Sequence, residues 1–479
     1  MSVTTDASHT IAYKEWTNIV YITNPVNEQY ESLNVIEPTS VDGTSVDASG
    51  APILFDIGVG GYMSSSVWVS GSGGSSGPGG GADTNSSYAL AAGYVVVQVG
   101  CRGRDNGSSG NYYGVAPAAI EDLKAAVRYI RHNSGSIPGN VNWIVTSGGS
   151  AGGALSALVG ASGVTSTNNN TLYEADLTTL GAASAADNIF AVGAWSPITN
   201  LDHADMAYEM EYGSLQSGGS LVNQTASSAL IALFDAYQDG LNLTDKRGSY
   251  GPLTHSNITD YILTQYMEPS LNKYVQNGGS APSYATCSGS GSAESCTFTF
   301  SDYVNNSIGS RGKGEPAFDA FFDITSSSSY YGTNVNTSCP AEVMEFGNSS
   351  GTASSYSGSN CSGGSPRHFT DFSSQAMNGT NISSSMQTTV NMMNPTYFIM
   401  YALNGVNDSS GIAPYWYIRD GSIATDTSAY IILDLATSLD DVVGASHVNA
   451  GEDWGEGHNV ETDPAGFHAW IKQITGYGS

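Results

Sequence analysis

In the first part of the chain, short apolar segments typical of strands alternate with segments whose apolar residues recur at helical spacing. Strands are predicted where apolar residues alternate or run together, at residues 16–22, 31–36, 51–57 and 94–99. A short helix is predicted at residues 88–92, and a longer one at residues 117–132, where Leu123, Val127 and Ile130 recur at helical spacing. Strands that alternate with helices predict a parallel sheet covered on both faces, and therefore an α/β fold.

This alternation breaks at about residue 203 and resumes at Pro395. The segment between them holds helical pieces among Ser/Gly-rich loops, at residues 226–237 and 258–275. The α/β pattern then ends with two predicted strands, at residues 415–419 and 442–448, and two predicted helices, at residues 428–438 and 466–474. We therefore predict a core formed by residues 1–202 and 391–479, with residues 203–390 inserted as a lid.

An apolar strand, a serine among small residues and a helix that starts at Ala154 follow one another from Val141. They contain the pentad Gly148-Gly149-Ser150-Ala151-Gly152, which matches the G-x-S-x-G nucleophile elbow of α/β-hydrolases. The neighbours of the serine must be small because the turn between strand and helix is sharp and strained. Other matches, around Ser75 and Ser349, lie in Gly/Ser-rich loops. Ser150 is therefore the candidate nucleophile, and a helix-capping serine is the structural alternative.

The N-terminus of the predicted helix behind Ser150 would offer backbone N–H groups to a developing oxyanion. We expect the N–H of Ala151 to form one half of this oxyanion hole. The other half should come from the loop after residues 51–57, where Gly60 or Gly61 fits by position. A tight turn without a ligand role is the alternative for these glycines.

A serine nucleophile needs a base and an acid that orients the base. In α/β-hydrolases the acid follows a late strand and the histidine follows the last one. His458 lies in a glycine-rich loop at the expected place, whereas His447 and His468 are predicted inside a strand and a helix. Asp426 and Asp420 both qualify as the acid, with a helix cap and a surface turn as their structural alternatives.

Composition excludes several other functions. The net charge of −29 includes only 14 basic residues, so nucleic acid is a poor partner. No apolar run approaches the roughly 20 residues of a membrane span, and the first residues as given lack the pattern of a secretory signal. No cysteine spacing resembles a zinc site, so neither a metal nor a cofactor is expected. The oligomeric state is left open.

Cysteines and glycosylation acceptors favour export. Cys287 could pair with Cys296 and Cys339 with Cys361 across flexible stretches, while Cys101 is predicted to be buried and unpaired. Asn-x-Ser/Thr acceptors recur at Asn85, Asn106, Asn169, Asn223, Asn242, Asn257, Asn305, Asn336, Asn348, Asn360, Asn378, Asn381 and Asn407. Chance accounts for part of these matches in a chain rich in Ser, Thr and Asn. We predict a secreted glycoprotein with disulfide bonds.

The chain resembles bacterial tannases over essentially its whole length, with the inserted segment weakest. The resemblance is carried by residues 147–158 around Ser150, by residues 188–192, by residues 200–209 (Asn-Leu-Asp-His-Ala-Asp-Met-Ala-Tyr-Glu), by Gly61-Tyr62, by residues 93–97 with 102–104, and by Asp426-Thr427-Ser428. It implies an α/β-hydrolase fold with a large lid and hydrolysis of galloyl esters. It also implies that Ser150 is the nucleophile and His458 the base, and that Lys313 and Asp426 contact the galloyl hydroxyls.

The sequence departs from the family pattern at two places. The family carries its triad acid two residues before the position of Asp426, where this chain has Ala424. The family also has a glutamate after the Lys313 region that grips the galloyl ring, and the matching stretch here, residues 326–330, has no carboxylate. We therefore expect Asp426 to orient His458, with Asp420 as the alternative, and we expect looser acyl specificity.

These observations predict a serine esterase that cleaves phenolic acid esters, most of all galloyl esters, and that binds small-molecule substrates. A feruloyl or general carboxylesterase with the same machinery is the nearest alternative. A catalytically impaired hydrolase that only binds phenolics is the alternative from another class, and Ala424 is the feature that favours it.

Overall fold

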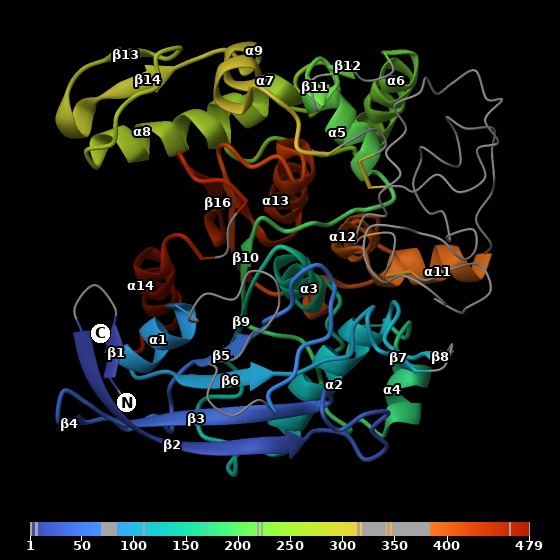
Figure 1. The fold of residues 1–479 in the computed structure, drawn as a ribbon, viewed down its shortest axis with the longest axis vertical. Coiled ribbons are helices and arrows are strands. Elements are labelled where there is room, and N and C mark those ends of the chain that lie inside the picture. The colour runs from blue at the N-terminus through green and yellow to red at the C-terminus, as the bar shows by residue number, and fades with distance from the viewer. Residues whose placement is uncertain are drawn as a thin grey trace. The chain divides into compact units, whose positions relative to one another are not determined.

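The computed structural model describes residues 2–4, 8–68, 84–108, 111–168, 170–217, 220–221, 224–313, 317–318, 342, 345–346, 384–458 and 461–478. The chain forms two compact units (Figure 1). The first unit contains Met1–Pro197, Tyr397–Tyr417 and Val460–Ser479, and the second contains Ile198–Thr396 and Ile418–Asn459.

A mixed sheet forms the centre of the first unit. Its strands are β1 (Ser2–Thr4), β2 (Ser8–Val20), β3 (Ser32–Val41), β4 (Thr44–Ser45), β5 (Ile53–Asp56), β6 (Val95–Val99), β9 (Ile144–Gly149) and β10 (Ala191–Trp195). They lie in the order β1-β2-β3-β6-β5-β9-β10, with β4 beside β3. β5 pairs in parallel with β6 and β9, and β10 pairs in parallel with β9, whereas β2, β3 and β6 pair antiparallel. The predicted parallel sheet is therefore confirmed for its central strands. A small hairpin, β7 (Gly107–Ser108) and β8 (Asn111–Tyr112), completes the strands of this unit.

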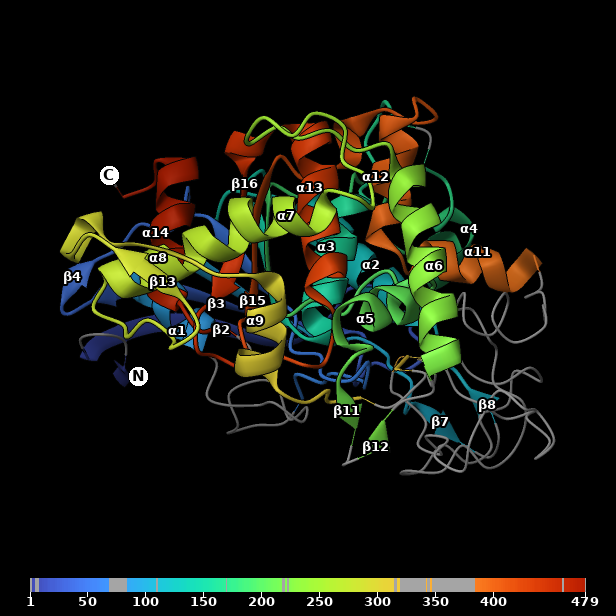
Figure 2. The same cartoon turned by 90° about the horizontal axis from the view of Figure 1, so that it is seen from above.

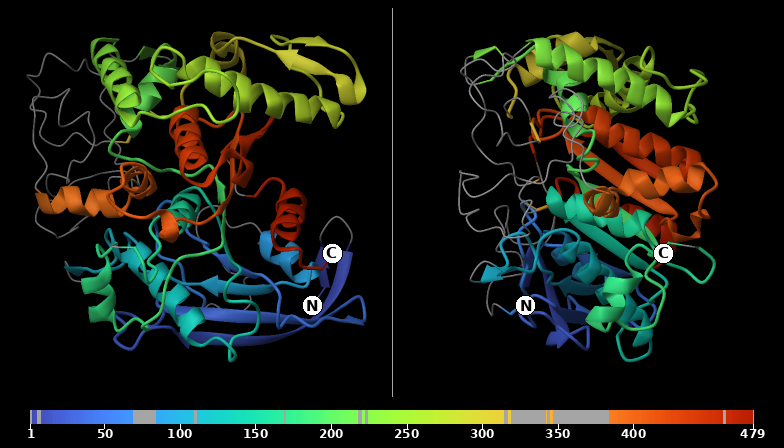
Figure 3. Two further views of the ribbon diagram at one scale, coloured as in Figure 1. Left: turned by 180° about the vertical axis from the view of Figure 1, so that it is seen from behind. Right: turned by 90° about the vertical axis from the view of Figure 1, so that its right-hand side faces the viewer.

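Helices cover both faces of this sheet. α1 (Thr84–Ala91) and α14 (Pro464–Thr475) lie side by side (Figures 1 and 3), and their apolar residues share one buried cluster with Val145 of β9. Successive residues of a strand point to opposite faces, and Thr146 meets α3 (Ala151–Ala161), where the Ser156 hydroxyl lies 2.7 Å from the Thr146 hydroxyl. α2 (Ala118–His132) packs against α3. The unit also contains α4 (Glu174–Leu180), the short turn η5 (Ser409–Gly411) and most of α12 (Pro395–Leu403).

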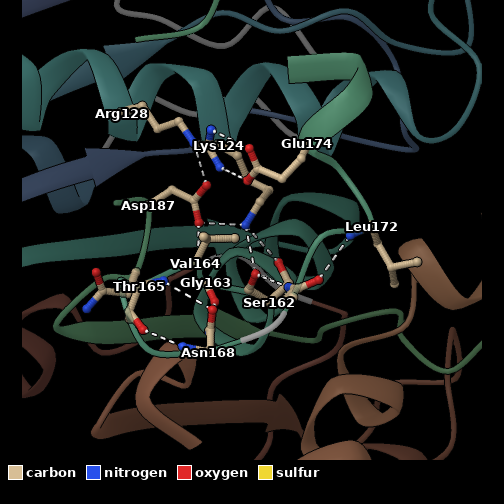
Figure 4. A network of polar contacts seen from close by, with 12 residues as sticks. Lys124, Arg128, Ser162, Gly163, Val164, Thr165, Asn168, Leu172, Glu174 and Asp187 are labelled. Carbon is tan, nitrogen blue, oxygen red and sulfur yellow. Dashed lines mark hydrogen bonds and ion pairs between the residues drawn. The ribbon is translucent and has the colours of Figure 1, made fainter. Parts of the chain in front are cut away.

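A buried ion network anchors α2 (Figure 4). Lys124 and Asp187 are both fully buried, with 2.8 Å between Nζ and Oδ1, and Asp187 also accepts from Nε of Arg128 at 2.8 Å. Lys124 donates a further hydrogen bond to the carbonyl of Ser162, just after α3. Removing one partner from such a pair costs about 3–5 kcal/mol because the other charge is left buried. The network therefore fixes α2 to α3 and to the segment before β10.

The second unit is mainly helical (Figure 2). Its helices are α5 (Ala204–Tyr212), α6 (Gln224–Leu241), α7 (Ile258–Ile262), α8 (Glu268–Gln276), α9 (Phe300–Tyr303), α11 (Ser384–Met392) and α13 (Ala429–Val443), with π-helical turns η1 (Leu263–Met267) and η3 (Val304–Ile308) and 3₁₀ turns η2 (Gly291–Ala293) and η6 (Ala445–His447). α7, η1 and α8 run on without a break. The strands are β11 (Gln216–Ser217), β12 (Ser220–Leu221), β13 (Thr286–Ser288), β14 (Ser295–Thr297) and β16 (Val448–Asp453), and β15 (Tyr415–Gly421) enters from the first unit.

A disulfide joins Cys287 of β13 to Cys296 of β14, as the sequence predicts. Cys101 is buried, and burial raises the pKa of its thiol. Cys339 and Cys361 lie outside the described residues. Among the described helices, none combines the length and the apolar character that a membrane span needs.

The predicted last strand at residues 442–448 is wrong. α13 continues to Val443, and the strand β16 spans Val448–Asp453 instead, with His447 in the turn between them. Gly444 ends the helix with a φ of +93°, a conformation that glycine adopts without steric cost. The two valines before it belong to the last helical turn, although their branched side chains favour strands. The division into a core and a lid at residues 203 and 390 stays a prediction.

Candidate active site

Ser150 stands on a strained turn between β9 and α3. Its φ is 59° and its ψ is −125°, and it is one of the few non-glycine residues with a positive φ among those the structure describes. Such a conformation costs about 1–3 kcal/mol and persists only where the surroundings enforce it. The Ser150 N–H donates to the carbonyl of Trp195 at 2.9 Å, which ties the turn to the end of β10. The local geometry is that of a nucleophile elbow.

The glycines around Ser150 are required by close backbone contacts. A Cβ on Gly148 would lie 2.5 Å from the carbonyl oxygen of Gly152, and a Cβ on Gly152 would lie 2.6 Å from that of Ile57. A Cβ on Gly153 would lie 2.6 Å from the carbonyl oxygen of Trp195. Because atoms cannot approach so closely, any side chain at these three positions would open the turn.

The two predicted halves of the oxyanion hole lie in neighbouring segments. Ala151 is the first residue of α3, and helix N-termini present N–H groups that the helix does not use. The next N–H, that of Gly152, donates to the carbonyl of Val59 at 2.8 Å. This bond holds the loop of Gly60 and Gly61 against the first turn of the helix.

The strand that carries Ser150 also holds the segment that follows His458 in sequence. The Ser147 hydroxyl donates to the Glu461 carboxylate at 2.8 Å, and the Asn85 amide donates to the Ser147 hydroxyl at 2.9 Å. The other oxygen of Glu461 accepts from the backbone N–H of Asn85 at 3.1 Å. Glu461 has a φ of +64° and is three residues away from His458 along the chain. Asn85 and Ser147 are fully buried, so the network is shielded from water.

In the second unit, His458 faces Asp426. Nδ1 of His458 lies 3.7 Å from Oδ2 of Asp426, which is an ion-pair distance and longer than a hydrogen bond. The His458 side chain is 29% exposed. Burial lowers its pKa from the ordinary value, and Lys313 lowers that pKa further, while Asp426 and Glu342 raise it. A lowered pKa keeps the imidazole neutral at neutral pH, as a general base must be.

Asp420, the alternative acid, is buried at the end of β15. Together with Glu452 and Glu211 it raises the pKa of Tyr303, which is raised most by its burial. Ala424, at the position where the family carries its acid, is 3% exposed, and its carbonyl accepts from the Tyr212 hydroxyl at 3.2 Å.

Lys313 lies beside a carboxylate that sequence reasoning missed. Its Nζ donates to Oε1 of Glu342 at 2.7 Å and lies 4.1 Å from the centre of the Phe318 ring. Glu342 is buried, with 7% of its surface exposed. Residues 326–330, the stretch that matches the family's glutamate segment, carry no carboxylate and lie outside the described residues, and Glu342 comes later in the sequence. The available signal was the pair Glu342 and Glu345 around an apolar Val-Met dipeptide, within an otherwise Ser/Gly-rich stretch.

Four ionisable side chains thus meet in the second unit: His458, Asp426, Lys313 and Glu342. They offer one ammonium donor and two carboxylate acceptors beside an imidazole. Such a set can bind several hydroxyl groups of one ring. The one described group with three potential metal-ligand atoms close together is Cys287, Glu294 and Cys296, and both of its sulfurs are in the disulfide.

Comparisons with known proteins agree with the predicted family. A family model described as BD-FAE matches residues 61–233. Fusobacterium nucleatum tannase is 32% identical, with 99% of this chain and 97% of that chain covered and a TM-score of 0.75. Tannin acyl hydrolase from Lactobacillus plantarum is 30% identical over 97% of this chain and 94% of that chain, with a TM-score of 0.74. A structure of tannin acyl hydrolase in complex with ethyl gallate is 30% identical over 99% of this chain and 96% of that chain, with a TM-score of 0.75. No match was found among curated proteins.

Proposed function

The chain belongs to the tannase family, and from this premise we propose that it is a serine esterase that hydrolyses phenolic acid esters, galloyl esters above all, through an acyl-enzyme. The observation that carries the proposal is the group of Lys313, Glu342 and Asp426 around His458. It combines a neutral base with groups that can bind a ring bearing several hydroxyls. The complex of a relative with ethyl gallate supports this substrate class.

In the proposed mechanism, Ser150 Oγ attacks the ester carbonyl carbon while His458 Nε2 takes the hydroxyl proton. The negative charge on the carbonyl oxygen is met by the N–H groups of Ala151 and Gly61, whose helix N-terminus and loop lie together. The tetrahedral intermediate collapses, the C–O bond of the alcohol breaks, and His458 returns its proton to that oxygen. Water then repeats the sequence on the acyl-enzyme, releasing the acid and the free serine.

Asp426 has two roles in this proposal. Its carboxylate stabilises the imidazolium that forms on His458, and it also accepts a hydrogen bond from a hydroxyl of the galloyl ring. Its side chain is 47% exposed, so it can reach a ligand as well as the imidazole. Lys313 and Glu342 bind the remaining hydroxyls. A site built to hydrogen-bond a hydroxyl rejects the ring that lacks it, because its buried polar groups are left unpaired.

We also propose that the protein is secreted. The Cys287–Cys296 disulfide supports an oxidising compartment. Asn242 and Asn305 are exposed and could carry glycans, whereas Asn85 and Asn106 are buried and could not while the chain is folded.

The proposed activity is tested with methyl gallate, methyl ferulate, methyl benzoate and p-nitrophenyl butyrate. Wild type should hydrolyse methyl gallate with the highest kcat/KM, and Ser150→Ala should lose about 10⁴-fold or more on every ester that wild type cleaves. Faster turnover of ferulate would identify a feruloyl esterase instead. Binding of gallate without hydrolysis would identify a non-catalytic binder, and equal rates for wild type and Ser150→Ala would reject the serine mechanism.

A further inference from the structure

We propose that the Tyr208 hydroxyl is a positioning group that fixes the spacing between Lys313 and Asp426, and that it thereby sets the preference for polyhydroxylated acyl rings. The inference rests on the proposed function. Tyr208 lies on α5 and does not touch substrate in this account. It acts through the backbones of the two segments that carry the ring-binding side chains.

The Tyr208 hydroxyl makes one hydrogen bond to each segment. It accepts from the backbone N–H of Lys313 at 3.0 Å and donates to the carbonyl of Thr425, the residue before Asp426, at 2.7 Å. A single oxygen atom therefore holds the two backbones at a defined separation. Because both bonds are made to main-chain atoms next to the binding side chains, a shift of the oxygen would move both side chains.

The ring of Tyr208 is held so that this oxygen cannot move away. The residue is fully buried, and its ring centre lies 4.5 Å from that of Tyr212 and 5.8 Å from that of Phe318. The guanidinium of Arg311 lies 5.1 Å from the ring centre. Burial raises the pKa of the phenol well above its usual range, so the hydroxyl keeps its proton for Thr425 at any pH at which the enzyme would work.

Neighbouring residues of α5 secure the Lys313 segment. Glu209 pairs with Arg311, whose Nε donates to the carbonyl of Lys313 at 2.9 Å. Asp205 accepts from the backbone N–H groups of Ala317 and Phe318, each at 2.8 Å.

The same helix secures the Asp426 loop. The single proton of the Tyr212 hydroxyl is shared between the carbonyls of Ala424 and Thr427, which lie 3.2 and 3.3 Å from its oxygen. Glu211 accepts from the N–H of Ala429 at 2.7 Å, at the start of α13. Tyr208, Glu211 and Tyr212 are spaced by three and four residues, so they share one face of the helix. Among these α5 residues, Tyr208 has the one oxygen that forms hydrogen bonds to both the Lys313 segment and the Asp426 loop.

Removal of this oxygen should affect esters of hydroxylated rings most. In Tyr208→Phe the ring packing is kept, but the Lys313 N–H and the Thr425 carbonyl lose their common partner. Lys313 and Asp426 can then drift relative to each other, and small misplacements of binding groups can cost up to about 10²-fold in rate. An acyl ring without hydroxyls makes no hydrogen bond to these groups. Its turnover should depend on their position only through the support that Asp426 gives to His458, which all esters share.

The experiment compares kcat/KM for methyl gallate and methyl benzoate in wild type, Tyr208→Phe and Tyr212→Phe. Tyr212→Phe is the matched control, because it removes a buried phenol oxygen that bonds the Asp426 loop without bonding Lys313. We expect Tyr208→Phe to lower kcat/KM for methyl gallate about 10-fold or more, mainly by raising KM, with a clearly smaller loss of kcat/KM for methyl benzoate. Tyr212→Phe should change the gallate-to-benzoate ratio less.

The double variant Tyr208→Phe with Lys313→Ala distinguishes a loss of positioning from a general disturbance of the structure. If Tyr208 acts through Lys313, adding Tyr208→Phe to Lys313→Ala should cost little more than Lys313→Ala alone. If Tyr208→Phe does not fold, p-aminophenylalanine at position 208 replaces it, since its amine donates to Thr425 but is a poor acceptor for Lys313. Equal losses on both esters, or an unchanged gallate preference, would overturn the inference. Loss of all ester hydrolysis in wild type would instead reject the proposed function.

Discussion

At the scale of single residues, the proposed mechanism gives Asp426 two tasks. The family places a separate acid two residues earlier, and this chain has the buried Ala424 there. The distance of 3.7 Å between Asp426 and His458 allows electrostatic support of the imidazolium, but no hydrogen bond in this conformation. In the proposed mechanism, one carboxylate therefore takes the two roles, support of the histidine and binding of the ring, for which the family pattern has two aspartates.

Asp426→Asn should lower kcat on methyl gallate by about 10²-fold or more, toward the ~10⁴-fold loss known for a triad aspartate. Asp426 raises the pKa of His458, so its neutralisation should lower that pKa. Because the base must be unprotonated, the acid limb of the kcat/KM profile should move to lower pH. Asp420→Asn is the control, and a larger loss in that variant would make Asp420 the acid.

Glu342→Gln should weaken the recognition of ring hydroxyls. It removes the charged partner of Lys313 and one acceptor at the site. A hydrogen bond to a charged group contributes about 1.5–3 kcal/mol, so the ratio of kcat/KM for methyl gallate over methyl benzoate should fall roughly 10- to 100-fold. The neighbouring buried Glu345→Gln serves as the control. An unchanged ratio in Glu342→Gln would exclude Glu342 from acyl recognition.

The position of His458 after a late strand follows from the order that the fold imposes. Asp426 and Asp420 both fit that order, and the choice of Asp426 rests on its place two residues after Ala424. Glu342 could not be predicted in the same way. Its approach to Lys313 depends on how the chain returns after a long Ser/Gly-rich stretch, and such a stretch carries no periodicity that fixes a register.

At the scale of elements, α5 holds the Lys313 and Asp426 segments of the proposed site. Asp205, Tyr208, Glu211 and Tyr212 bond to main-chain atoms of these segments, and Glu209 pairs with the guanidinium of Arg311. Residues 200–209 stand out in the sequence through the family resemblance, but their contacts to the two segments could not be predicted, because bonds to main-chain atoms leave no pattern in side-chain chemistry. The misplaced last strand has a different cause: local propensity favoured a strand at residues 442–448, whereas Gly444 sets the end of the helix.

The segment after His458 should depend on its anchor to β9. Glu461→Ala leaves the Ser147 hydroxyl and the Asn85 N–H without their acceptor, so we expect kcat on methyl gallate to fall several-fold and the melting temperature to fall as well. Ser147→Ala should have a related effect, and the double variant should be little worse than either single one. Strictly additive losses in kcat would contradict a shared role.

At the scale of the whole molecule, the chain is strongly acidic and keeps several carboxyl groups buried. Burial raises the pKa of Glu31 and Glu211 to about 7 and that of Glu121 and Asp434 to about 8. Since each folded pKa lies above the unfolded one, the folded state binds more protons between them. The stabilisation of the folded state by these protonated carboxyl groups is complete below about pH 4 and is lost as the pH rises toward 8. The melting temperature should therefore be higher at pH 5 than at pH 8, and a rise from pH 5 to pH 8 would contradict this.

Asp434→Asn tests one of these groups. Asp434 is fully buried in α13, with Gln238 of α6 as its hydrogen-bond partner. The amide has the same shape and no charge, so the variant should gain melting temperature over wild type at pH 8 and change little at pH 5. Equal destabilisation at both values would mean that Asp434 is ionised and required in that form.

The central claim is that Ser150 is an activated nucleophile at a site for galloyl esters. Its most direct test is the reaction of the protein with a fluorophosphonate, followed by intact mass and peptide mapping. The account predicts a single adduct on Ser150, formed more slowly in the presence of methyl gallate and abolished in His458→Ala. The absence of an adduct, or an adduct on another serine in a protein that still hydrolyses methyl gallate, would contradict it.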